Sequence, residues 1–218
     1  MLERISRRER FDLVIAWLAI SIAFSLAFSG GVGVWMGSPA MEIPLGRYLL
    51  YLILSMVTVG VGFVLHELAH KFTAMHYGYW AEFRKDNLML LVAVVLAALV
   101  GVVFAAPGAT LIYGAGVTRE QNGKISAAGP VTNLLLCIPF AFVLALTAWL
   151  GPTAWWGQLL SLTGMVGLQV NAMIASFNML PVSVLDGRKV LAWNPAIFAV
   201  LIIASFGILI TTFYPVFL

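Results

Sequence analysis

Long apolar runs separated by short polar stretches dominate the pattern of this chain. The apolar runs cover residues 11–28, 49–65, 88–106, 134–150, 157–177 and 195–214. Each run is about as long as the ~17–25 residues that an α-helix needs to cross the hydrocarbon core of a bilayer. The pattern therefore predicts an all-α polytopic membrane protein with five to six transmembrane helices, forming a single integral membrane domain over residues 1–218.

The composition excludes an ordinary soluble protein. Hydrophobic residues make up 62% of the chain and charged residues only 10%, whereas soluble domains have about 25% charged residues. The formal net charge is +3, but the basic residues are scattered between the apolar runs and form no single basic face. We therefore expect the lipid bilayer, and no nucleic acid, as the environment and partner of most of the surface.

Basic residues predict the orientation of the chain in the cell membrane. Four arginines precede the first apolar run: Arg4, Arg7, Arg8 and Arg10. By the positive-inside rule they place the N-terminus in the cytoplasm. The first span then runs outward, and the second, over about residues 47–74, runs inward.

Near the inner end of the second span the sequence reads His66-Glu67-Leu68-Ala69-His70. Residues four apart lie on one face of a helix, so both imidazoles can reach one metal ion. Glu67 lies about 100° further round the helix. Its carboxylate is placed to hydrogen-bond a water at the metal, which is the arrangement that a zinc hydrolase needs.

This motif lies at the end of an apolar run, and that position favours a functional role for its ionisable side chains. A charged side chain at membrane depth costs at least ~2.5–3.5 kcal/mol, so such residues usually serve a function. We therefore expect one Zn²⁺ per chain, held by His66 and His70, with Glu67 as the catalytic base. The alternatives are a structural pairing of these side chains between helices, a zinc or other metal transporter, and a catalytically silent metal-binding scaffold.

Two imidazoles leave a tetrahedral zinc ion short of a protein ligand, so a third ligand is expected. Most other acidic residues lie in polar stretches, and for Asp12, beside the N-terminal arginines, we expect a surface ion pair. Asp186 is different, because it follows an apolar run that Pro181 interrupts. A break of this kind frees backbone groups that must line a site or a cavity. Asp186 is the predicted third ligand.

Three blocks of sequence resemble the site-2 proteases, which are intramembrane zinc metalloproteases. They are His66 to His70, Ala128-Gly129-Pro130-Val131-Thr132-Asn133, and Asn178 to Gly187 with its Leu185-Asp186-Gly187 triplet. The resemblance implies that His66, His70 and Asp186 bind zinc and that Glu67 is the catalytic base. It also implies substrate-binding roles for Asn178, beside the substrate backbone, and for Asn133, a polar core residue close to the site.

The resemblance implies regulated intramembrane proteolysis, in which a peptide bond is hydrolysed in or near the transmembrane segment of a membrane-anchored protein substrate. The catalytic core would cover about residues 49–190, with flanking spans at about 11–28 and 195–214. The chain resembles a minimal prokaryotic-type member without a PDZ module. It departs from the family at Ser183, where a second proline often follows the Asn-x-x-Pro element.

The metal ligands restrict the topology of the intervening chain. His66 and His70 lie near the inner end of an inward-running span, so Asp186 must also lie near the cytoplasmic face. Residues 88–118 must then enter the membrane and return, as a re-entrant and partly β hairpin with 107–118 extended. This arrangement leaves every one of the twelve Lys and Arg residues except Arg47 on the cytoplasmic side, and predicts that the active site opens there.

Overall fold

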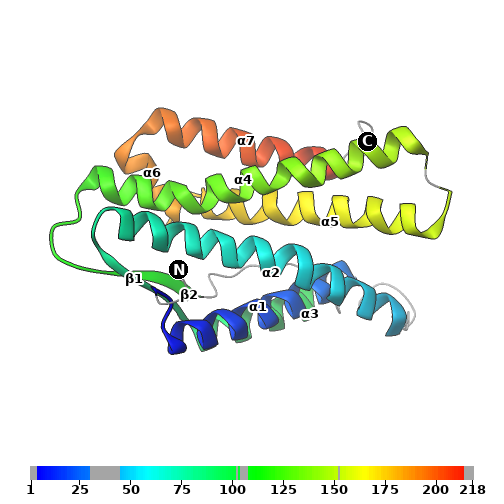
Figure 1. Ribbon diagram of the computed structural model, residues 1–218, viewed down its shortest axis with the longest axis horizontal. Coiled ribbons are helices and arrows are strands. Elements are labelled where there is room, and N and C mark those ends of the chain that lie inside the picture. Colours follow the sequence, from blue (N-terminus) through cyan, green and yellow to red (C-terminus); the bar gives the residue numbers. More distant parts are fainter. Residues whose placement is uncertain (1–3, 30–44, 102, 104–107, 152, 214–218) are drawn as a thin grey trace. The chain divides into compact units, whose positions relative to one another are not determined.

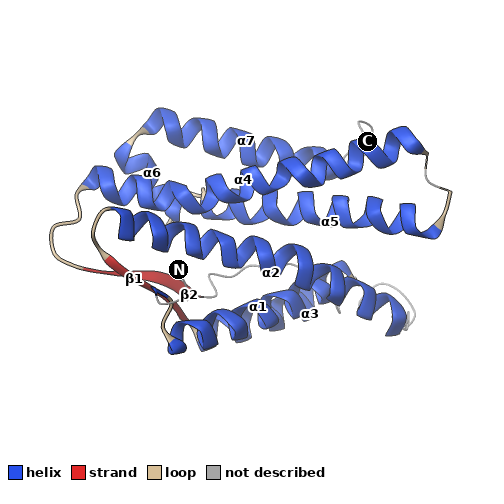
Figure 2. Ribbon diagram, in the orientation of Figure 1, coloured by secondary structure: helices blue, strands red, loops and turns tan. Residues whose placement is uncertain are grey.

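A computed structural model of the chain describes residues 4–29, 45–101, 103, 108–151 and 153–213. Helices make up most of it, and two short strands form the only sheet among the described residues (Figures 1 and 2). The elements in chain order are α1 (Arg7–Phe28), α2 (Leu45–His76), β1 (Trp80–Lys85), α3 (Asn87–Val100), β2 (Gly108–Tyr113), α4 (Arg119–Leu150), α5 (Trp155–Asn178), α6 (Asp186–Trp193) and α7 (Pro195–Phe213).

Five of the described helices are long and apolar enough to cross a membrane: α1, α2, α4, α5 and α7. Helix α3 is also apolar but has 14 residues. At 1.5 Å per residue it rises about 21 Å, which is less than the ~30 Å hydrocarbon core. The prediction of an all-α polytopic membrane protein is confirmed, with five helices of spanning length and one shorter apolar helix.

The described chain forms two compact units, and each is considered by itself. The first comprises the described residues within 1–64 and 82–111. In this unit α1 packs along α3, and the indole of Trp17 donates a hydrogen bond to the Met56 carbonyl at 2.9 Å. Gly60 makes this contact possible, because a Cβ there would overlap the Trp17 ring.

Two acidic residues near the start of α1 are buried, which corrects the expectation of a surface ion pair at Asp12. Asp12 is only 7% exposed, and its carboxylate lies 3.6 Å from the Arg84 guanidinium of β1. Glu9 is fully buried and accepts a hydrogen bond from the Phe83 amide at 3.0 Å. Within the first unit these contacts join α1 to β1, since buried carboxylates need such partners.

Strands β1 and β2, which precede and follow α3 in the chain, form a short two-stranded sheet. Strand β2 lies within residues 107–118, where the sequence predicts extended backbone, although Pro107 lies outside the described residues. Its partner β1 falls in the stretch that the sequence pattern marks only as polar. Gly108 allows the close approach of the strands, because a Cβ there would meet the Arg84 carbonyl.

The second unit comprises the described residues within 65–81 and 112–218. Helix α4 packs against α5 and α6, and α7 packs against α5 and α6 (Figure 1). A capping box begins α4, in which Thr118 and Gln121 exchange hydrogen bonds with each other's backbone, and the Tyr79 hydroxyl donates to the Gln121 side chain at 2.9 Å. These contacts position the start of α4 against the end of the α2–β1 turn.

Candidate metal centre

His66 and His70 lie on one face of α2, as the four-residue spacing predicts. Their Nε2 atoms are 3.0 Å apart, and the two rings meet edge to face with centroids 4.6 Å apart. His66 is 2% exposed and His70 is 7% exposed. The helix therefore presents a pair of buried imidazole nitrogens to a single point.

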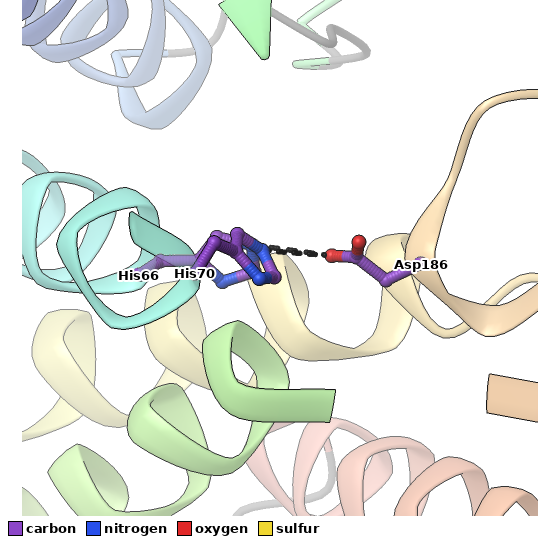
Figure 3. Close-up of side chains that lie close together, drawn as sticks. All are labelled: His66, His70 and Asp186. Carbon is purple, nitrogen blue, oxygen red and sulfur yellow. Dashed lines mark hydrogen bonds and ion pairs between the residues drawn. The ribbon is translucent and has the colours of Figure 1, made fainter. Parts of the chain in front are cut away.

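The fold brings Asp186 to the same point from a distant part of the sequence. Asp186 is the first residue of α6, and its carboxylate faces both imidazoles (Figure 3). Its Oδ2 lies 3.1 Å from Nε2 of His70 and 3.5 Å from Nε2 of His66.

The break between α5 and α6 determines where Asp186 lies. Gly187 sits directly against the end of α5, because a Cβ there would overlap the Met179 carbonyl. Ser183 adopts a left-handed backbone conformation with φ +47°. Proline is locked near φ −65°, so this turn cannot accept the second proline that is frequent in the site-2 proteases.

Hydrogen bonds on the far side of each ring orient the two imidazoles. Nδ1 of His66 lies 2.6 Å from Oδ1 of Asn133, and Nδ1 of His70 lies 2.8 Å from the Ile125 carbonyl oxygen. An oxygen of this kind only accepts, so each Nδ1 carries the hydrogen. In the neutral rings both Nε2 atoms then present lone pairs to each other and to Asp186.

Three lone-pair atoms that converge in this way require a positive charge between them. Two unprotonated nitrogens cannot hydrogen-bond to each other, and the third group is a carboxylate. In a tetrahedral zinc site with bonds of about 2.0–2.2 Å, neighbouring ligand atoms lie about 3.3–3.6 Å apart. The distances here are 3.0, 3.1 and 3.5 Å, and the donor set of two imidazoles and one carboxylate suits zinc.

Gly129 allows α4 to pass directly beside the imidazoles. A Cβ on this residue would overlap Nε2 of both His66 and His70. Gly129 thus explains part of the Gly-Pro-x-x-Asn block, because the same helix supplies Asn133 one turn later. The glycine gives the rings room, and the asparagine orients one of them.

Glu67 is 8% exposed and follows His66 directly on α2. It is outside the cluster that the three candidate ligands form. The catalytic role of Glu67 stays a prediction, as do the zinc-binding roles of the three ligands.

The two predicted substrate-binding asparagines lie in different surroundings. Asn133 is fully buried and contacts His66, so the structure places it behind the site and not on an open face. Asn178 is half-buried at the end of α5, and its amide nitrogen donates to the Ile174 carbonyl at 3.0 Å. Their roles toward substrate stay predictions.

Two groups that support the candidate centre were not predicted from the sequence: the side chain of Asn171 and the backbone carbonyl of Ile125. Asn171 of α5 is fully buried and accepts a hydrogen bond from Asn133 at 2.9 Å. A polar amide inside the apolar run 157–177 is a signal that could have indicated it. The Ile125 carbonyl has no such signal, because every residue carries a backbone carbonyl.

Comparisons with known proteins agree with a zinc hydrolase. No protein-family model matches the chain, and no solved structure matches it at a significant level. The chain is 40% identical over 197 residues to "Putative zinc metalloprotease MJ0611" of Methanocaldococcus jannaschii, and the match covers 90% of each sequence. With this identity over nine-tenths of both sequences, the chain belongs to the same zinc metalloprotease family as the M. jannaschii protein.

Proposed function

We propose that the protein is an intramembrane zinc metalloprotease of the site-2 type, which hydrolyses a peptide bond in or near the transmembrane segment of a membrane-anchored substrate. One observation carries the proposal. Three buried ligand atoms from His66, His70 and Asp186 converge on one point, and two of them belong to a helix that is long and apolar enough to cross a membrane. A hydrolytic metal site on such a helix suits a substrate that is itself in the membrane.

In this proposal His66, His70 and Asp186 would hold the zinc ion. Zinc held by these residues would supply Lewis-acid chemistry and would make a water molecule acidic enough to be deprotonated near neutral pH. Glu67 accepts the proton from the attacking water and passes it to the departing amine. Asn133 and the Ile125 carbonyl keep the two rings turned toward the metal.

A helical substrate has its own carbonyls hydrogen-bonded, so it must unwind before it can be cut. We propose that β2 helps in this step. It pairs with β1 on one side, and no other described strand pairs with it. An extended substrate segment could add to that edge through main-chain hydrogen bonds, with Asn178 as a further partner for the substrate backbone.

We also propose that the N-terminus and the opening of the active site face the cytoplasm. The support comes from the charges, because all Lys and Arg residues except Arg47 then lie on that side. Labelling of single-cysteine variants at Arg8 and Arg188 in intact cells tests this orientation. Modification of either residue by an impermeant reagent added outside would contradict it.

The central experiment uses purified protein in liposomes with a membrane-anchored peptide. Glu67→Gln keeps the size of the side chain and removes its basicity, so we expect zinc binding to persist and cleavage to fall by about 10²–10⁴-fold. Glu120→Gln is the matched control, because Glu120 is exposed at the start of α4 and pairs with Lys124. This control should keep full activity.

The same liposomes separate the proposal from its rivals. Full proteolysis by the zinc-bound Glu67→Gln variant would refute the role of Glu67. Zinc flux into the liposomes without any cleavage would identify a transporter. Zinc binding with neither cleavage nor flux would identify a silent scaffold.

A further inference from the structure

A buried amide, Asn171, lies behind the candidate metal centre, and its described hydrogen bonds go to other residues than the three ligands. It sits on α5 and is fully buried. Its Nδ2 donates to the Gly167 carbonyl at 2.9 Å, and its Oδ1 accepts from Nδ2 of Asn133 at 2.9 Å. Asn133 in turn meets His66. These contacts form a relay from a backbone carbonyl to a candidate ligand.

The Gly167 carbonyl determines which group donates and which accepts at each hydrogen bond of this relay. A carbonyl oxygen can only accept a hydrogen bond, so the Asn171 atom that faces Gly167 must be its NH₂ group. The other amide atom, an oxygen, therefore faces Asn133. An oxygen also only accepts, so Asn133 must turn its own NH₂ group toward Asn171.

The orientation of the Asn133 amide then determines which tautomer the neutral His66 ring adopts. With its NH₂ group directed at Asn171, Asn133 presents Oδ1 to Nδ1 of His66 at 2.6 Å. Nδ1 must carry the hydrogen, and Nε2 is left with a lone pair toward His70 and Asp186. A flipped Asn133 would set two amide oxygens against each other and an NH₂ group against Nδ1, which favours the tautomer that cannot bind a metal through Nε2.

We propose that Asn171 is a positioning residue of the metal centre, acting through Asn133 to keep His66 in the tautomer whose Nε2 can bind zinc. The inference rests on the proposed function for the identity of the metal. It does not depend on proteolysis, because the tautomer of His66 is a property of the metal-free chain. Substitution of a residue that orients a metal ligand by hydrogen bonding typically changes the metal affinity by 10–100-fold.

Three variants of Asn171 differ in whether they keep a hydrogen-bond acceptor that faces Asn133. Asn171→Leu removes the acceptor. Asn171→Ser also removes the acceptor that faces Asn133, since a short hydroxyl at this place can bond to the carbonyl four residues earlier, and this variant is the safer one for folding. As the protonated acid, Asn171→Asp keeps an acceptor oxygen toward Asn133 and an O–H donor toward the Gly167 carbonyl. Thr163→Val is the matched control on the same helix, where Thr163 donates only to the Leu159 carbonyl among the contacts described.

The full-length protein in detergent micelles gives two readouts. The ¹⁵N shifts of the His66 ring in the metal-free protein report the tautomer, and competition with a chromophoric chelator reports zinc affinity. We expect the Leu and Ser variants to gain the Nε2–H tautomer and to bind zinc 10–100-fold more weakly. The Asp variant and Thr163→Val should stay within a few-fold of the unaltered protein.

A double-mutant comparison tests whether Asn171 acts through Asn133. Asn133→Leu alone should weaken zinc binding, and adding Asn171→Leu to it should weaken binding no further. Additive losses would overturn the relay, as would an unchanged His66 tautomer in both Asn171→Leu and Asn171→Ser. A loss in Asn171→Asp as large as in Asn171→Ser would also overturn it. Absence of cleavage by the unaltered protein would count against the proposed function alone.

Discussion

The close passage of α4 beside the imidazoles leads to a sharp prediction for Gly129→Ala. The added Cβ would overlap Nε2 of His66 and of His70, where carbon contacts require about 3.5–4.0 Å. The rings or the helix must therefore move by roughly 1 Å, whereas metal–ligand distances tolerate only about 0.2 Å. We expect zinc affinity to fall by at least about 100-fold, or about 2.8 kcal/mol.

Helix propensity alone predicts that the same substitution stabilises the fold. Alanine is favoured over glycine in a helix interior by about 1 kcal/mol, so the metal-free fold of the variant should persist. Gly207→Ala in α7 is the matched control, because a Cβ there meets nothing within 4 Å.

Chelator competition measures zinc affinity in both variants, and circular dichroism checks their helix content. Unchanged zinc affinity in Gly129→Ala would refute the steric argument. A similar loss in Gly207→Ala would show that the effect is not local.

Three further outcomes follow from the same geometry. Asp186→Asn keeps the shape of the side chain but removes its charge, and should weaken zinc binding by at least about tenfold, or 1.4 kcal/mol, in the same competition assay. Ser183→Pro should also weaken binding, because proline cannot adopt φ +47°, whereas Ser183→Gly should not; equal affinities would contradict the role of this turn. Zinc at 100 times its dissociation constant should raise the free energy of unfolding by about 2.7 kcal/mol, measured by denaturant titration in micelles, and His66→Ala should abolish the increase.

Much of the membrane architecture follows from local sequence because it depends on apolar length. A run long enough to cross a bilayer forms a helix, since no water is present to satisfy backbone groups in any other open form. The predicted spans therefore agree closely with α1, α2, α5 and α7, whereas α4 begins at Arg119, well before the apolar run 134–150. Strand β1 was not predicted because it lies in a short stretch of mixed polar and apolar residues, and because its pairing with β2 is non-local.

The buried acids of α1 show where local reasoning fails. Asp12 lies beside arginines in the sequence, which favours a surface ion pair, yet it is buried near Arg84. The partner of a charged side chain is decided by which elements pack together. A count of neighbouring charges along the chain cannot supply that information.

By itself the sequence determined the chemistry that the candidate centre can offer. His66, Glu67, His70 and Asp186 stand out because ionisable groups are costly near a bilayer and few are present. Only the tertiary structure decided how these groups meet: the turn at Ser183 and Gly187 carries Asp186 to the imidazoles, and Gly129 gives the rings space. It also decided that Asn171 orients Asn133, because hydrogen-bond direction depends on which atoms face each other in space.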